Sequence, residues 1–164
     1  MTTANFLDAI RTISAGIAEY QSTGATVWLP LILSHLALAK AELGRFDDAL
    51  RCLDDAMLAI KTTEERWCEA EVFRAAGQIA LKVPKPDAPR APEYFERALA
   101  VARKQQAKSW ELRASMSLAR LWRDQGKPQQ ARELLAPVYG WFTEGFDTRD
   151  LKEAKVLLLE ELAA

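Results

Sequence analysis

Apolar residues recur every three or four positions along most of the chain, which predicts amphipathic helices and no strand. A first helix is expected over residues 5–22, with Asn5 as its N-cap and Gly24 just beyond its end. Four apolar residues on one face of this helix are Phe6, Ile10, Ile13 and Ile17. We expect this face to point outward, where a second copy of the chain in a homodimer, or a longer parent chain, covers it.

The rest of the chain predicts paired helices joined by short turns. The pattern gives three pairs and a last charged helix that caps them, over residues 27–63, 66–105, 108–142 and 148–162. Pro30 suits the first turn of a helix, and Gly44 ends that helix. Three prolines between Val83 and Arg90 exclude a continuous helix there. Pro137 lies inside an expected helix and should bend its axis.

Small residues recur at the same places in the three pairs. Ala49, Ala91 and Ala131 each follow a turn and lie 42 and 40 residues apart. The residues expected to pack the repeats together are Ala37, Gly44, Ala49, Ala56, Gly77, Ala91, Ala98, Ala119, Gly126 and Ala131. Small residues let antiparallel helices approach closely, and a repeat of about 20–50 residues is typical of a solenoid. The sequence therefore predicts one all-α solenoid domain of about eight helices over residues 1–164.

Composition narrows the class of protein. Hydrophobic residues make up 49% of the chain, enough for a continuous core, and the charged residues nearly cancel to a net −1. A general nucleic-acid binder is therefore not expected. The strongly apolar stretch from Val27 to Leu38 is too short to span a membrane, and the N-terminus lacks the pattern of a signal peptide. We expect a cytoplasmic protein.

The residues around the turns resemble the tetratricopeptide repeat (TPR). The matching residues are Gly44, Phe46, Ala49, Leu53 and Ala56 in the first pair, Gly77, Ala91, Phe95 and Ala98 in the second, and Ala119, Trp122, Gly126, Ala131 and Leu135 in the third. The resemblance implies a right-handed superhelix whose concave groove is lined by the first helix of each pair. The period of 40–42 residues resembles a longer-helix TPR subclass of bacterial signalling proteins.

A more specific resemblance lies in residues 106–147. This run is similar to the C-terminal TPR region of large bacterial proteins that carry an adenylate or guanylate cyclase domain, or a transcriptional-regulator domain, followed by an ATPase module. The similarity extends from about Gly16 onward. The chain contains no cyclase domain and no G-x-x-x-x-G-K-[ST] phosphate-binding loop. The resemblance therefore implies the scaffold and neither activity.

Candidate catalytic and metal-binding residues are few. His35 lies in a leucine-rich helix without partners at metal-ligand spacing, which favours a partly buried structural role. Cys52 and Cys68 lie on different helices, which favours buried free thiols in a reducing cytosol over a disulfide or metal role. Adjacent carboxylates such as Asp47 and Asp48 diverge on a helix and cannot act together on one bond. No cofactor and no metal are expected.

The expected groove carries a polar stripe. The candidate binding residues are Glu71, Arg74 and Gln78 in one unit, and Arg113, Met116, Arg120 and Arg123 at matching positions in the next. The functional interpretation is a site where guanidinium groups bind carboxylates of an acidic peptide. The alternative, which the sequence favours, is that these arginines form structural ion pairs with Glu71, Glu111 or the neighbouring unit. Packing between units is also favoured over exposed anchors for Trp67, Trp110, Trp122 and Trp141.

These patterns predict a non-catalytic scaffold that binds a protein or an acidic peptide segment in bacterial signalling or regulation. An alternative is a sensor whose groove closes over a small anionic ligand. An enzyme without a recognisable motif is a third class, for which the sequence offers no residues.

Overall fold

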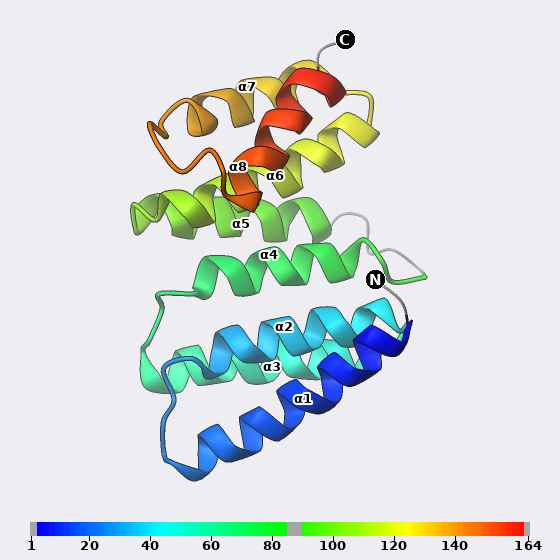
Figure 1. The fold of residues 1–164 in the computed structure, drawn as a ribbon, viewed down its shortest axis with the longest axis vertical. Helices are drawn as coiled ribbons and strands as arrows, with labels where there is room; N and C mark the ends of the chain where they lie inside the picture. The colour runs from blue at the N-terminus through cyan, green and yellow to red at the C-terminus, as the bar shows by residue number, and fades with distance from the viewer. Residues whose placement is uncertain (1–2, 85–89, 163–164) are drawn as a thin grey trace.

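The computed structural model describes residues 3–84 and 90–162, and within these ranges the chain is all-helical, as expected, with no strand. The described residues form eight α-helices and a short π-helix, and Figure 1 shows how the α-helices are arranged. Their bounds are α1 (Thr3–Ser22), α2 (Leu29–Glu42), α3 (Phe46–Thr63), α4 (Glu69–Ala80), α5 (Arg90–Lys104), α6 (Lys108–Asp124), α7 (Pro128–Tyr139), α8 (Arg149–Val156) and η1 (Leu157–Glu161).

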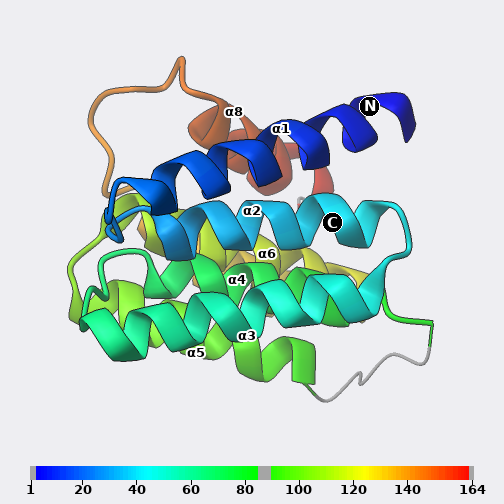
Figure 2. The ribbon, with the colours of Figure 1, turned by 90° about the horizontal axis from the view of Figure 1, so that it is seen from below.

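The helices pack as consecutive pairs. Helix α2 packs against α3, α4 against α5, and α6 against α7, while α2, α4, α6 and α8 contact one another in succession. The pairs follow one another along the long axis of the molecule (Figure 1). Seen from below, α3 and α5 lie on one side of α2, α4 and α6, and α1 and α8 lie on the other (Figure 2). This arrangement is consistent with a helical repeat.

Three apolar clusters follow the same packing rule. The first joins α2 and α3 to the start and one face of α4, and Ile10, Ile13 and Ile17 of α1 pack against it. The second joins Phe73 of α4 and the apolar face of α5 to α6. The third joins α6 and α7 to α8 and η1. Each pair thus completes its core with the next helix, so neighbouring units stabilise one another.

The expected packing residues take equivalent places. All seven alanines among them are completely buried, namely Ala37, Ala49, Ala56, Ala91, Ala98, Ala119 and Ala131. Gly44 and Gly126 end the first helices of their pairs with positive φ angles of 72° and 73°. At Gly77 an added Cβ would lie 2.5 Å from a ring carbon of Phe95. The burial of the alanines and the tight contact at Gly77 agree with close helix packing, whereas nothing lies within 4 Å of a Cβ added at Gly44 or Gly126.

Polar contacts join one unit to the next at nearly the repeat spacing. The indole Nε1 of Trp67 donates to the carbonyl of Val27 at 3.1 Å, across 40 residues. Lys82 pairs with Glu42 at 2.6 Å, also across 40 residues. The amide of Gln105 donates to the carbonyl of Arg66 at 2.7 Å across 39 residues. Each contact thus links a helix end or loop to one that lies about one repeat further along the chain.

Several expected details differ from the structure. Asn5 is not an N-cap, because α1 already begins at Thr3. Helix α7 ends at Tyr139, earlier than expected, and Pro137 lies inside it. The expected turn between Val83 and Arg90 falls mostly on residues 85–89, which lie outside the described residues.

The first helix faces the opposite way from the prediction. Ile10, Ile13 and Ile17 pack inward against the core rather than pointing outward, because α1 lies against α2. The outward side of α1 carries mostly small and polar residues, with Leu7 as its large exposed apolar residue. The proposed reason for a dimer through this helix is therefore wrong. Among the helices of the described residues, none is both long enough and apolar enough to cross a membrane.

Two glycines inside helices provide a matched stability test. Gly16→Ala in α1 should raise the free energy of unfolding by up to about 1 kcal/mol, because alanine favours helix and nothing lies within 4 Å of its Cβ. Gly77→Ala should lower the free energy of unfolding by about 1–2 kcal/mol. The new Cβ would clash with the buried Phe95 ring, and this cost outweighs the helix preference of alanine. Urea denaturation measures both changes. Equal stabilisation by the two substitutions would contradict the close contact of α4 with α5.

Candidate functional site

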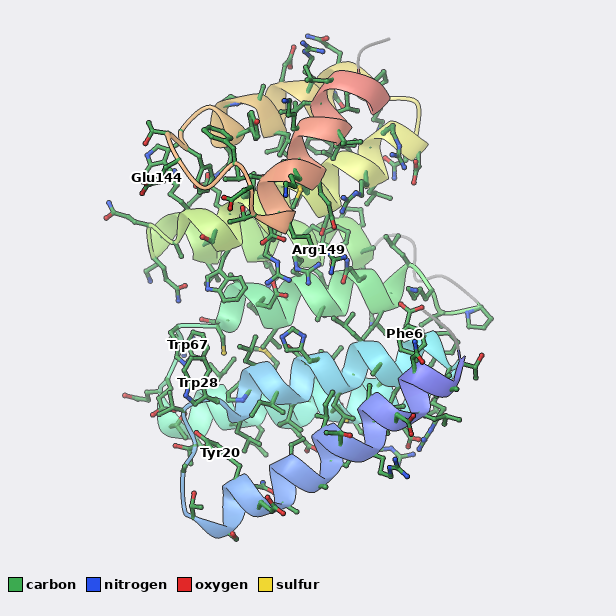
Figure 3. The ribbon with its side chains drawn as sticks, in the orientation of Figure 1. Phe6, Tyr20, Trp28, Trp67, Glu144 and Arg149 are labelled. Atoms are coloured by element: carbon green, nitrogen blue, oxygen red, sulfur yellow. The ribbon has the colours of Figure 1, made fainter. Side chains whose placement is uncertain are left out.

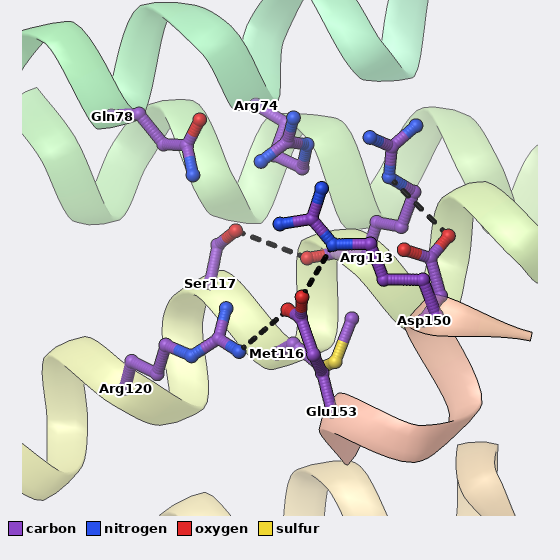
Figure 4. A pocket seen from close by; sticks show the side chains of 9 residues that line it. Arg74, Gln78, Arg113, Met116, Ser117, Arg120, Asp150 and Glu153 are labelled. Carbon is purple, nitrogen blue, oxygen red and sulfur yellow. Dashed lines mark hydrogen bonds and ion pairs between the residues drawn. The ribbon is translucent and has the colours of Figure 1, made fainter. Parts of the chain in front are cut away.

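Three helices bring arginine side chains to a single pocket of about 310 Å³. Nine residues line it, and we call it the arginine pocket (Figure 4). They are Arg74 and Gln78 of α4, Arg113, Met116, Ser117 and Arg120 of α6, and Arg149, Asp150 and Glu153 of α8. The helical spacings of three, four and seven residues place each set on one face of its helix. The succession of α4, α6 and α8 then brings these faces together.

A buried carboxylate behind the pocket holds two of the arginines. Glu71 is only 1% exposed, and its oxygens accept hydrogen bonds from Arg74 Nε at 2.7 Å and Arg74 Nη2 at 2.6 Å. Arg113 Nη1 of the next unit lies 3.3 Å from the same carboxylate. Glu71 therefore fixes the positions of guanidinium groups from α4 and α6.

Two carboxylates of α8 complete the ion-pair network at the open side. Asp150 lies 3.6 Å from Arg113 Nε. Glu153 accepts hydrogen bonds from Arg120 Nη2 at 3.1 Å and from Arg149 Nε at 2.7 Å. The bond from Arg149 is the main cause that lowers the pKa of Glu153, and the bond from Arg120 adds to it against the effect of partial burial. Glu153 is therefore ionised at neutral pH.

The pocket has an excess of positive charge. Four arginines face it, and three carboxylates, Glu71, Asp150 and Glu153, balance three of them. Within the described part of the chain, Arg120 and Arg149 each donate one hydrogen bond to Glu153. A guanidinium has five N–H donors, so most donors of these two residues stay available to a ligand. Arg149 is also the most accessible of the four, with 88% of its side chain exposed, and Figure 3 marks its position.

His35 of α2 lies near the ion-pair network. Its surface is more exposed than expected, but its ring is still partly desolvated by the surrounding protein. This partial burial is the main cause that lowers the pKa of His35; Glu71 opposes the shift, and Arg113 and Arg74 add to it. His35 is therefore neutral at pH 7 and adds no positive charge.

The structure gathers most of the expected groove residues. Arg74, Gln78, Arg113, Met116 and Arg120 line the pocket, and Glu71 lies directly behind it. Arg123 lies at the end of α6 outside this lining, and it pairs with Asp124 at 2.7 Å. Arg74 and Arg113 both pair with Glu71, as the ion-pair interpretation expects.

Sequence reasoning missed the contribution of α8. The sequence predicts only a charged capping helix for the segment that contains Arg149, Asp150 and Glu153, and it does not single out Ser117. The spacing of the charged residues on α8 can be read from the sequence. The contact of that face with α6 forms only in the folded chain, so the sequence alone does not reveal it. The apolar side of α8, including Leu151 and Ala154, is buried as expected for a cap. The last turn continues as the π-helix η1.

Both cysteines are buried and free, as expected. The thiol of Cys52 lies 3.2 Å from Lys40 Nζ. Burial raises the pKa of Cys68 to about 11, so this thiol stays protonated at neutral pH. Among the residues that the structure describes, no group of three or more histidine, cysteine, aspartate or glutamate side chains has the arrangement of a metal site.

Comparison with known proteins does not assign a family. No protein-family model matches the chain. No curated protein sequence matches it either. The chemistry of the site therefore carries the functional argument.

Proposed function

We propose that this chain is a non-catalytic helical-repeat scaffold that binds an acidic segment of a protein partner in the arginine pocket. The observation that carries the proposal is the convergence of Arg74, Arg113, Arg120 and Arg149 from three helices on one pocket. Planar guanidinium groups bind carboxylates through two parallel hydrogen bonds, which gives both affinity and orientation. The excess positive charge favours an acidic ligand.

A TPR-type superhelix is the architecture that we propose for the scaffold. Its support is the succession of helix pairs, the equivalent burial of Ala49, Ala91 and Ala131, and the bridges between residues 39 and 40 apart. The resemblance described above extends the proposal to a cytoplasmic regulator in bacterial signalling, as part of a cyclase- or ATPase-type system.

The pocket supports binding better than catalysis. The hydroxyl of Ser117 donates to the backbone carbonyl of Arg113 at 3.0 Å, so it is committed to the helix. Asp150 and Glu153 are paired with arginines, and the lowered pKa of Glu153 makes it a weak base. These contacts therefore do not favour a general base or a nucleophile in the pocket.

Arginine substitutions test the proposal with a fluorescein-labelled hexaglutamate peptide. Arg149→Gln and Arg120→Gln should each weaken its binding about tenfold, the effect of losing one charge-assisted contact of about 1.4 kcal/mol. The matched control is Arg51→Gln on α3, an exposed arginine outside the pocket. Fluorescence anisotropy measures the three affinities. Equal affinities, or an equal loss in the Arg51 variant, would refute the pocket as the binding site.

A small anionic ligand is the second candidate. The lining contains one apolar side chain, Met116, and a pocket of about 310 Å³ suits a compact anion. Citrate and inorganic phosphate should then displace hexaglutamate at concentrations well below those at which chloride does. Displacement only at the ionic strength where chloride acts would favour the protein partner, because general screening then explains it.

A further inference from the structure

A second hollow lies at the edge of the molecule where α5 ends and α6 begins. It has a volume of about 460 Å³ and is lined by Arg103, Gln106, Lys108 and Trp141. These four residues, all in the described part of the chain, are distinct from those of the arginine pocket. We call this site the Trp141 hollow.

Trp141 presents an aromatic surface to solvent. The sequence pattern placed it in the core, but it is 58% exposed. The ring of Phe142 meets it edge-on, with centroids 5.2 Å apart, and Lys108 Nζ lies 5.7 Å from its centroid. The indole is therefore exposed yet oriented by two neighbours, which lowers the cost of ordering it around a ligand.

A buried carboxylate arranges the two cations of the hollow. Glu111 accepts a hydrogen bond from Arg103 Nε at 2.9 Å and another from Lys108 Nζ at 2.7 Å. Burial raises the pKa of Glu111, but these two hydrogen bonds outweigh it, so the pKa is lower than usual. Two cations thus share one ionised carboxylate, and the cluster keeps one positive charge beside the indole.

We propose that the Trp141 hollow binds a planar aromatic anion, of which a nucleoside monophosphate is the leading example. The aromatic ring stacks on Trp141, because tryptophan offers a large π surface. The anionic group contacts Arg103 and Lys108, and the amide of Gln106 supplies a donor and an acceptor for the ring edge. The volume lies within the range of small-ligand pockets. This site is independent of the proposed function.

The indole N–H signals of the ¹⁵N-labelled chain test the proposal directly. The chain has five tryptophans, and Trp141→Phe assigns one signal to this site. Adenosine monophosphate and indole-3-acetate should each shift the Trp141 signal with millimolar affinity. The signal of Trp28, which is 52% exposed and stacked edge-on with Trp67, is the internal control and should not move.

Variants separate this site from the arginine pocket. Lys108→Met and Arg103→Gln should each raise the dissociation constant measured from the Trp141 signal about tenfold. The other indole signals should stay in place during the titration. Arg149→Gln should leave the response unchanged. A shift with the nucleotide alone identifies a nucleotide, and a shift with the acetate alone identifies an aromatic carboxylate. The proposal is wrong if neither compound moves the Trp141 signal at about 10 mM, or if inorganic phosphate moves it equally.

Discussion

Glu71→Gln should lower the free energy of unfolding by about 3–5 kcal/mol, because it removes the carboxylate from a buried ion pair. Arg74, which is itself buried, loses the charge partner of both its hydrogen bonds, and Arg113 loses its contact with α4. The neutral amide donates as well as accepts, so it cannot face two guanidinium groups as the carboxylate does. Urea denaturation followed by circular dichroism measures the change.

Two variants sharpen this prediction. Glu42→Gln removes a half-exposed ion pair with Lys82, which also joins two units. This substitution should lower the free energy of unfolding by less than about 1 kcal/mol. The double substitution Glu71→Leu with Arg74→Met replaces the pair by apolar side chains and should recover most of the stability. If Glu71→Gln costs no more than Glu42→Gln, the buried carboxylate does not anchor the pocket.

Phe95→Ala should destabilise the chain by about 3–5 kcal/mol, because Phe95 is 1% exposed at the centre of the middle core cluster. The ring fills the space beside Gly77, so its removal leaves a cavity against α4. In this background Gly77→Ala should become stabilising, because its Cβ no longer meets the ring. Denaturation of the two single variants and the double variant gives the coupling energy. Strictly additive effects would show that the two residues do not touch.

The helices and their small contact residues were predictable because both depend on local sequence. Helical periodicity marks the elements, and Ala49, Ala91 and Ala131, which the repeat singles out, are all completely buried. The polar stripe of α6 was also visible, since residues three and four apart share a face. Five of the seven expected groove residues line the pocket on this basis.

The features that the sequence did not predict depend on how the helices pack in three dimensions, which the periodicity of apolar residues does not encode. The apolar face of α1 was recognised, but its inward direction depends on where α1 packs. Trp141 was assigned to the core from its residue type, whereas it lies beyond the end of α7 and is exposed. The arginine pocket needed α8, whose Arg149 lies 36 residues after Arg113 in the sequence and reaches the same surface only in the folded chain.

The arginine side-chain Nε–H signals during titration with hexaglutamate test the central claim most directly. An acidic ligand in the pocket should shift the signals of Arg120 and Arg149 at stoichiometric peptide, with those of Arg51 on α3 and Arg97 on α5 unchanged. Glutamine substitutions at these positions assign the signals. Signals that move together at all four arginines, or that move at neither Arg120 nor Arg149, would contradict a scaffold that binds acidic segments in this pocket.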